Sequence, residues 1–493
     1  MTIGIGASLL VAVALGLLAL ACVGWNGAAA PRNPLAAFLA VGLGLGLSSC
    51  VLFVSLLALD GPSRRLPVVE LVLLLALGGG ALAAARRPGL RPLAAAARAP
   101  AGERGPALLR AALALAAACA AVAFGIQSAT RPQGGWDAWM TWNMHARAIF
   151  RGGEHWRAVL ASLPAWSHPD YPLLVSGSVV RIWAYAGRET ALAPVLVGAL
   201  FTFATAGVLY AGVSAIRSRM QGALAALLLL GTKFFVLHGA SQFADIPLAF
   251  FFLATLVLLA LPAVWPEDRP RLLLLAGVMG GLAAWTKNEG LLFLVATPLA
   301  YAAVLGRDAG WPRVLADVRS FGAGLAPVLV LVLGFKIWLA PPNDLMADHG
   351  LRQTAARLLD GARLLAVTGG FWRAYLEVGA QGLTGVLLLA YWGVAGPALP
   401  GPGRTTAKVA ALTVLLMLAG YAVVLLTSPT PLLATNIRSI NRLLLQVWPS
   451  MLFAFFAAAR TPEEAGVFGR AAAADTNAGP PSGRSLPPVG EPT

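Results

Sequence analysis

Long runs of apolar residues divide the chain into segments of the length that crosses a lipid bilayer. The runs stay apolar for about 20 residues, whereas the strands of a membrane barrel alternate apolar and polar positions over about 10. They therefore predict helices and an all-α polytopic membrane protein. We expect about 13 transmembrane helices, at residues 3–23, 34–59, 66–85, 107–127, 190–216, 222–237, 246–264, 272–285, 291–305, 321–339, 383–399, 409–426 and 443–459.

Basic residues in the links between these runs predict the orientation of the chain. The link 86–106 holds five arginines and one acid, Glu103. Because cytoplasmic links are enriched in Lys and Arg, we place this link in the cytoplasm. Alternate crossings then put the basic links 217–219, 268–271, 307–313 and 404–408 on the same side. This assignment requires that residues 172–187 lie along the membrane surface and do not cross it.

The same pattern divides the chain into three parts. Residues 1–106 form N-terminal transmembrane hairpins and the basic cytoplasmic loop. Residues 107–459 form a transmembrane catalytic domain, whose non-cytoplasmic loop 128–189 carries juxtamembrane helices. Residues 460–493 are rich in Pro, Gly, Ala and Ser and cannot bury a core, so we expect a disordered cytoplasmic tail.

Composition supports the membrane assignment and limits the partners. The chain is 58% hydrophobic and 12% charged, which is more apolar surface than a soluble core of this length could hide. The net charge of +15 would suggest nucleic acid in a soluble protein, but here the arginines cluster between apolar runs, where anionic lipid accounts for them. We expect no nucleic acid partner. The three cysteines lie in apolar runs and predict neither a disulfide nor a zinc site.

The first candidate site residues open the outer loop. Trp136, Trp139 and Trp142 lie three residues apart and would form one stripe on a helix. An amphipathic helix with its tryptophans among lipid headgroups is the alternative to a ligand-binding stripe. Asp137 is a lone carboxylate among them. Beside a membrane it would be poorly solvated, which suits a general base; an exposed helix cap is the alternative.

A second candidate is the turn that contains His168, Asp170 and Tyr171. Flanking prolines fix an extended backbone that presents the three side chains together. An acid and a histidine at this spacing are able to bind a divalent cation or to orient a substrate hydroxyl, so a divalent metal is a possible cofactor. A plain structural turn is equally compatible with the sequence.

Two further candidates are short breaks between apolar runs that should emerge on the outer side. Asp245 lies in the first break and Lys287 and Glu289 lie in the second. Asp245 is either a site residue or a helix cap. Lys287 and Glu289 form either a solvated turn or a group in which the lysine holds a lipid phosphate.

The last candidate is a pair of arginines just before the final apolar run. Arg438 and Arg442 are four residues apart and face the same way on a helix, where they would form a fork for a phosphate or pyrophosphate. Snorkelling arginines at the membrane edge are the alternative, although arginines at an outer edge run against the usual charge bias.

Taken in order, these motifs resemble the GT-C superfamily of polyprenyl-phosphate-sugar-dependent glycosyltransferases. The likeness is to its protein-mannosyltransferase-like and aminoarabinose-transferase-like branches, and it covers roughly residues 107–305. The segments that carry it are Trp136 to Trp139, His168 to Leu173, Ala244 to Pro247 and Thr286 to Gly290.

The resemblance implies an inverting glycosyltransferase in the cell inner (plasma) membrane. It implies a polyprenyl-phosphate-linked sugar as donor, a lipid, glycan or protein as acceptor, and Asp137 as the general base. In the same interpretation Lys287, Arg438 and Arg442 bind the leaving lipid phosphate. Two features depart from the family: the loop opens with a single acid, which leaves metal dependence undetermined, and no large soluble domain follows the last span.

Other functions fit parts of the pattern. A transporter or flippase for a lipid-linked glycan would use the same arginines and aromatics without a reacting carboxylate. A polymerase or ligase of surface polysaccharide would place its chemistry in a later outer loop, and the segment 343–373 offers Asp344, Asp348, His349 and Arg352 for it. A structural scaffold does not explain ionisable residues at several outer span edges.

Overall fold

The computed structural model describes residues 2–25, 34–62, 65–86, 107–341, 351–398, 401–429, 433–434, 437 and 439–466. Within these ranges the secondary structure is helical, apart from one isolated β-bridge between Pro397 and Ala459. The predicted all-α class is therefore confirmed. The acidic and histidine residues Asp344, Asp348 and His349 lie outside the described residues, as do most of the basic link 86–106 and residues 467–493.

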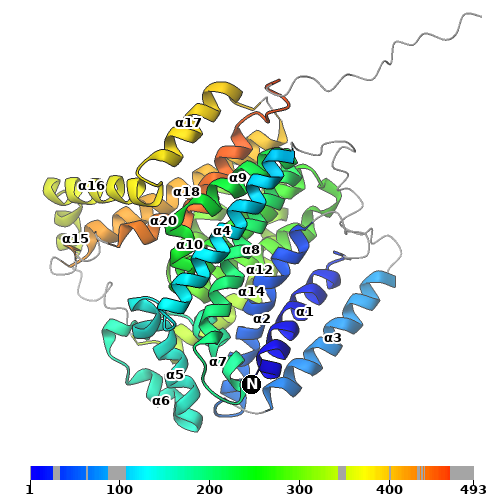
Figure 1. Ribbon diagram of the computed structural model, residues 1–493, viewed down its shortest axis with the longest axis vertical. Coiled ribbons are helices and arrows are strands. Elements are labelled where there is room, and N and C mark those ends of the chain that lie inside the picture. The colour runs from blue at the N-terminus through cyan, green and yellow to red at the C-terminus, as the bar shows by residue number, and fades with distance from the viewer. Residues whose placement is uncertain are drawn as a thin grey trace, which may run out of the picture.

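Ten of the described helices are long and apolar enough to cross a membrane. They are α1 (Thr2–Cys22), α2 (Leu35–Ala58), α3 (Leu66–Arg86), α4 (Ala107–Thr130), α8 (Leu192–Ile216), α11 (Asp245–Ala260), α13 (Glu289–Asp308), α14 (Trp311–Trp338), α18 (Pro402–Thr427) and α20 (Ile440–Ala458). They form the bundle in Figure 1.

Two bent helix pairs bring the number of spans to at most twelve in the described residues, so the expected count of about 13 is not confirmed. The pairs are α9 (Arg219–Gly231) with α10 (Lys233–Ala240), bent by 63°, and α16 (Gly361–Val378) with α17 (Leu383–Ala395), bent by 80°. The remaining predicted span, at 272–285, forms α12 (Arg269–Thr286). Its first turn carries Arg269 and Arg271.

The predicted outer loop, residues 128–189, folds into short helices at one end of the bundle, as Figure 1 shows for α5 (Asn143–Gly152) and α6 (Trp156–Ala161). The next helix, α7 (Leu174–Ala186), has 13 residues and is about 20 Å long, which is too short to cross a bilayer. That it lies along the membrane surface stays a prediction. All residues from Leu174 to Trp183 are buried, because α7 packs against α1 and α2.

A fully buried ion pair holds α7 in place. The Arg181 guanidinium donates to both oxygens of Glu70 on α3, at 2.6 and 2.8 Å, and to the carbonyl and hydroxyl of Ser8 on α1. The Tyr185 hydroxyl donates to the same Glu70 carboxylate. Both charged side chains are 0% exposed. A charge in such a place needs an opposite charge and several hydrogen bonds, and here each is supplied.

The centre of the bundle is α11, whose residues from Asp245 to Leu258 are all buried. It packs against α8, α12 and α20. Beside it, α12 and α14 approach unusually closely, because Gly277 faces the backbone of Phe321 and Gly324 faces the backbone of Leu274. A Cβ atom at either glycine would lie 1.9 Å from a carbonyl oxygen. Small residues allow membrane helices to pack in this way without a hydrophobic driving force.

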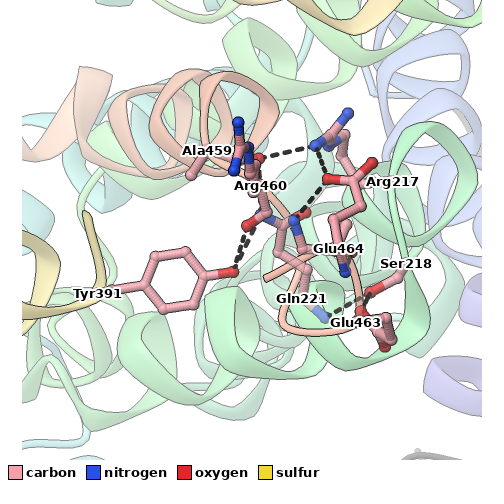
Figure 2. Close-up of polar contacts among 9 residues, drawn as sticks. Arg217, Ser218, Gln221, Tyr391, Ala459, Arg460, Glu463 and Glu464 are labelled. Atoms are coloured by element: carbon pink, nitrogen blue, oxygen red, sulfur yellow. Dashed lines mark hydrogen bonds and ion pairs between the residues drawn. The ribbon is translucent and has the colours of Figure 1, made fainter. Parts of the chain in front are cut away.

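At the other end of the bundle, the chain that follows α20 is tied to the link between α8 and α9. Figure 2 shows the Arg217 side chain donating to the carbonyl of Ala459 and to the Glu464 carboxylate, while Ser218 donates to Glu463. The Tyr391 hydroxyl of α17 donates to the carbonyl of Arg460. Residues 460–466, which the sequence assigned to the disordered tail, are therefore bonded to the bundle.

Removal of one partner of the buried pair should be far more costly than removal of both. Glu70→Ala leaves the Arg181 charge without its partner, and we expect it to lower the free energy of unfolding in detergent micelles by about 3–5 kcal/mol. The double variant Glu70→Leu with Arg181→Met removes both charges and should recover most of this loss. A double variant that is less stable than Glu70→Ala would contradict this account.

Candidate functional site

The candidate site centres on Asp245, the first residue of α11. This carboxylate is 0% exposed and receives three donors. They are Lys287 from the link after α12, at 3.1 Å, and Arg442 and Gln446 from α20, at 3.0 and 2.6 Å. Two helices and a link thus meet at one buried negative charge. Asp245 is more than a helix cap, because side chains from elsewhere in the chain bind both of its oxygens.

A second carboxylate, that of Glu289 on α13, closes the inner part of this group. It lies 2.7 Å from Lys287 and accepts from Gln446 at 3.2 Å. The Tyr421 hydroxyl of α18 donates to Gln446 at 2.7 Å, which orients the amide so that its NH2 faces the two carboxylates. Lys287 is therefore shared between two acids. Burial lowers its pKa, but the carboxylates of Asp245 and Glu289 raise it by more, so the pKa of Lys287 lies above its ordinary value.

Asp137 joins the group through Arg442 and is not the lone carboxylate that the sequence suggested. One oxygen of Asp137 lies 2.6 Å from an Arg442 nitrogen, while another nitrogen of the same guanidinium binds Asp245. The Asp137 side chain is 28% exposed, against 0% for Asp245. The correction has a simple cause: the planar guanidinium binds two carboxylates at once. Arg442 thus connects an outer acid to a buried one.

The backbone around Asp137 is fixed by the link between α10 and α11. Gly135 donates its N–H to the Ser241 carbonyl at 3.0 Å, and Gly134 adopts a positive φ of 78° beside the same oxygen. The Gln242 amide completes the contact, because it accepts from Asn143 at 2.9 Å and donates to the Pro132 carbonyl. This contact places the start of the outer loop next to Asp245.

The tryptophans do not form one stripe. Residues Ala138–Trp142 form a π-helical turn, which shifts the register that a regular helix would give. Trp136 and Trp139 are exposed and contact each other edge to face, with ring centroids 4.8 Å apart. Trp142 is buried and stacks on Tyr171, with ring centroids 5.4 Å apart. The exposed pair lies next to Asp137 in the chain, on the open side of the site.

The predicted turn at His168 to Tyr171 packs against the same group. His168 has a φ of 53° and stacks on Tyr171, whose ring also lies beneath the Lys287 ammonium at 5.6 Å. Burial raises the pKa of the Tyr171 hydroxyl, and Lys287 partly opposes this rise. Asp170 accepts from Asn288 at 2.7 Å and lies 3.5 Å from Lys336 of α14. The turn therefore supports Lys287 and the link that carries it.

A divalent cation at His168 and Asp170 stays a prediction. In the described part of the chain, His, Cys, Asp and Glu side chains form no group of three that could hold a metal ion. Asp170 and His168 instead contact Asn288, Lys336 and Tyr171.

The structure brings together Asp137, Asp170, Asp245, Lys287, Glu289 and Arg442, which the sequence singled out at five separate places. Arg438 lies outside the described residues, so the predicted arginine fork stays a prediction. Four further members were missed: Asn288, Lys336, Tyr421 and Gln446. Lys336 and Gln446 each left a signal, because each is a polar residue inside an otherwise apolar run, and Gln446 follows Arg442 by one helical turn.

Comparison with known families supports the assignment made from the motifs. Residues 173–338, about a third of the chain, match the profile of the dolichyl-phosphate-mannose-protein mannosyltransferase family. This stretch resembles a membrane glycosyltransferase of the GT-C type. No curated protein and no solved structure matches the chain.

The matched stretch divides the site in an informative way. Asp245, Lys287 and Glu289 lie inside it, whereas Asp137 and Arg442 lie before and after it. The structure therefore adds the outer acid and its arginine to the part that the family comparison covers, and Arg442 makes the connection through Asp245.

A histidine near the site offers a test of the outer segment. His145 of α5 is fully buried, and its Nε2 lies 2.9 Å from the Ser167 carbonyl, which requires the hydrogen to be on Nε2. Burial lowers the pKa of His145 from 6.5 to about 4, although the hydrogen bond to Ser167 opposes this shift.

The unfolded chain takes up a proton on this histidine near pH 6.5, and the folded chain does so near pH 4. The contribution of the neutral imidazole to the free energy of unfolding is therefore fully present above pH 6.5 and is lost as the pH falls to 4. We measure the free energy of unfolding in detergent at pH 7 and at pH 4. On this acidification we expect it to fall by about 3 kcal/mol less in His145→Gln than in wild type. Parallel stability curves for the two proteins would refute this assignment.

Proposed function

We propose that the protein transfers a sugar from a polyprenyl-phosphate donor to an acceptor hydroxyl at the outer face of the membrane, with Asp137 as the general base. The observation that carries this proposal is the bridge of Arg442 between the partly exposed Asp137 and the buried Asp245. The bridge places a carboxylate at the open edge of a buried charged group that also contains Lys287.

Exposure identifies Asp137 as the acid best placed to meet a substrate. Its side chain is 28% exposed, whereas those of Asp245 and Asp170 are 0% and 4% exposed and Glu289 is engaged by both Lys287 and Gln446. A general base must reach within hydrogen-bond distance of the proton that it removes. The inner carboxylates are held instead by fixed donors, which suits them to keep the cations in place.

The reaction that we propose is a single displacement. The acceptor oxygen attacks the anomeric carbon of the sugar while its proton passes to Asp137. The bond between the anomeric carbon and the phosphate oxygen breaks, and the polyprenyl phosphate leaves with the electron pair. Attack from the face opposite the leaving group inverts the configuration. The exposed Trp136 and Trp139 offer ring faces on which a sugar stacks.

Charge balance suggests the order of binding. The carboxylates of Asp137, Asp245 and Glu289 outnumber the two cations, Lys287 and Arg442, so this group carries a formal charge of −1. An incoming phosphate therefore has to replace a carboxylate on a cation. Asp137 is the most exposed partner, and we propose that the donor phosphate displaces it from Arg442. The released carboxylate is then available to accept a proton.

The location and partners follow from the same interpretation. The chain is a multi-pass membrane protein, and we propose the inner (plasma) membrane as its site of action. We propose that membrane lipid surrounds the protein and that a lipid, a glycan or a protein accepts the sugar.

Replacement of Asp137 is the direct test of the base. Asp137→Asn should lower turnover by roughly 100-fold or more, because it removes the proton acceptor. The measurement is transfer from radiolabelled polyprenyl-phosphate sugars by the purified protein. Glu154→Gln, which changes an exposed acid on the same loop, is the matched control and should keep full activity. Normal turnover in Asp137→Asn would rule out the proposed base.

The role of Arg442 is tested by a substitution that keeps its charge. Arg442→Lys leaves a cation beside Asp245, but an ammonium lacks the planar fork that reaches a second oxyanion at the same time. We expect the donor KM to rise about 10–100-fold with a smaller change in kcat. Arg373→Lys, at an exposed position of α16, is the control. An unchanged donor KM in Arg442→Lys would show that the phosphate binds elsewhere.

A further inference from the structure

A cavity lies at the end of the bundle opposite the candidate site. It has a volume of about 330 Å3 and is enclosed by the last turns of α11 and α13 and the first turns of α18. Both α11 and α13 begin at the candidate site, with Asp245 and Glu289, and end at this cavity. The cavity and the proposed site of transfer are therefore separated by the length of a membrane-spanning helix.

Several features place the mouth of the cavity at a membrane boundary. Trp311, the first residue of α14, is 62% exposed, as expected for a tryptophan at headgroup level. Arg307 lies in the last turn of α13 and Arg313 in the first turn of α14. The first turns of α18 carry Arg404 and Lys408. These basic residues are exposed. They belong to the links that the charge pattern placed together on one side of the membrane.

The lining changes from polar to apolar with depth. The mouth contains Arg313, Asp308 and Thr405, and the wall contains Leu256, Leu305 and Val409. A second cavity of about 20 Å3 shares Leu259 and Tyr301 with the first and is lined further by Leu273, Pro298 and Phe321. A ligand that fits the first cavity has a polar head and an apolar part.

The polar groups at the mouth of the cavity indicate the chemistry of the ligand's head group. Arg269 is held by Asp317, at 2.7 and 2.5 Å, and by the Tyr301 hydroxyl, so it forms a fixed part of the wall. Arg313 is exposed and has no ion-pair partner among the described residues. A cation at the edge of an apolar cavity is complementary in charge to the phosphodiester of a lipid. Asp308, which accepts from Thr405, is placed to accept from a head-group hydroxyl.

We propose that this cavity binds an anionic glycerophospholipid from the membrane leaflet opposite the candidate active site. The phosphodiester lies against Arg313, and the acyl part of the lipid contacts the apolar wall formed by Leu256, Leu305 and Val409. This site is separate from the proposed transfer reaction and does not depend on it. Because a bound lipid contacts α11, α13 and α18 together, it stabilises the same helices that carry Asp245, Glu289 and Tyr421.

The proposal is tested by lipid titration of the purified full-length protein in detergent, followed by native mass spectrometry and thermal unfolding. We expect phosphatidylglycerol to bind and to raise the unfolding temperature, and phosphatidylcholine and inorganic phosphate to have little effect. Arg313→Gln should weaken phosphatidylglycerol binding about tenfold or more, as expected for a lost charged hydrogen bond. Ala309→Phe, which narrows the mouth at an exposed position, should weaken it as well.

Arg319→Gln is the matched control. Arg319 is an exposed arginine on the same helix that lines neither cavity, so its replacement removes the same charge without touching the site. Equal loss of binding in Arg313→Gln and Arg319→Gln would overturn the proposal in favour of general surface charge. Stabilisation by inorganic phosphate alone, or equal binding of phosphatidylcholine, would also overturn it.

Discussion

A buried carboxylate at the start of α11 organises one end of the helix bundle. Asp245 has no contact with solvent, so its charge is tolerated only where cations and amide donors surround it. Lys287, Arg442 and Gln446 supply these contacts from two other parts of the chain. Once α11 is in place, α20 and the link between α12 and α13 have to meet its first residue. The positions of the remaining site residues follow from that requirement.

The site that results has an inner and an outer layer. In the inner layer, Asp245 and Glu289 hold Lys287, and Tyr421 and Gln446 fix the geometry. In the outer layer, the Asp137 carboxylate contacts Arg442, its ion-pair partner among the described residues. A rigid inner layer keeps the cations charged and in position, while the outer acid has a single ion-pair partner in the described group. This division explains how one arginine is able to take part both in the fold and in the proposed binding of a phosphate.

Paired charges also fix the parts of the fold that lie away from the site. The short helix α7 is inserted between longer helices because Arg181 and Glu70 neutralise each other inside the bundle. At the opposite end, Arg269 is held by Asp317, and Arg217 binds Glu464 of the segment after α20. Ion pairs therefore lie at both ends of the long helices, and close packing through glycines, as between α12 and α14, fills the apolar middle. The large cavity opens where α11, α13 and α18 diverge at one of these ends.

The sequence by itself determined the helical membrane class, the approximate bounds of most spans and the short polar breaks that carry Asp245, Lys287 and Glu289. These features depend on local composition, because a lipid bilayer selects apolar segments of a given length and leaves ionisable residues at their edges. The same motifs were enough to suggest the resemblance that the match over residues 173–338 supports.

Tertiary structure alone decided which charges meet. It paired Asp137 with Arg442, more than 300 positions later in the chain, and showed that Lys287 is shared between two acids. It also replaced the expected tryptophan stripe by an exposed pair and a buried Trp142, because a π-helical turn changes the register. An ion pair between distant residues leaves no periodic trace in a sequence. It depends on how the helices pack, and only the folded chain contains that information.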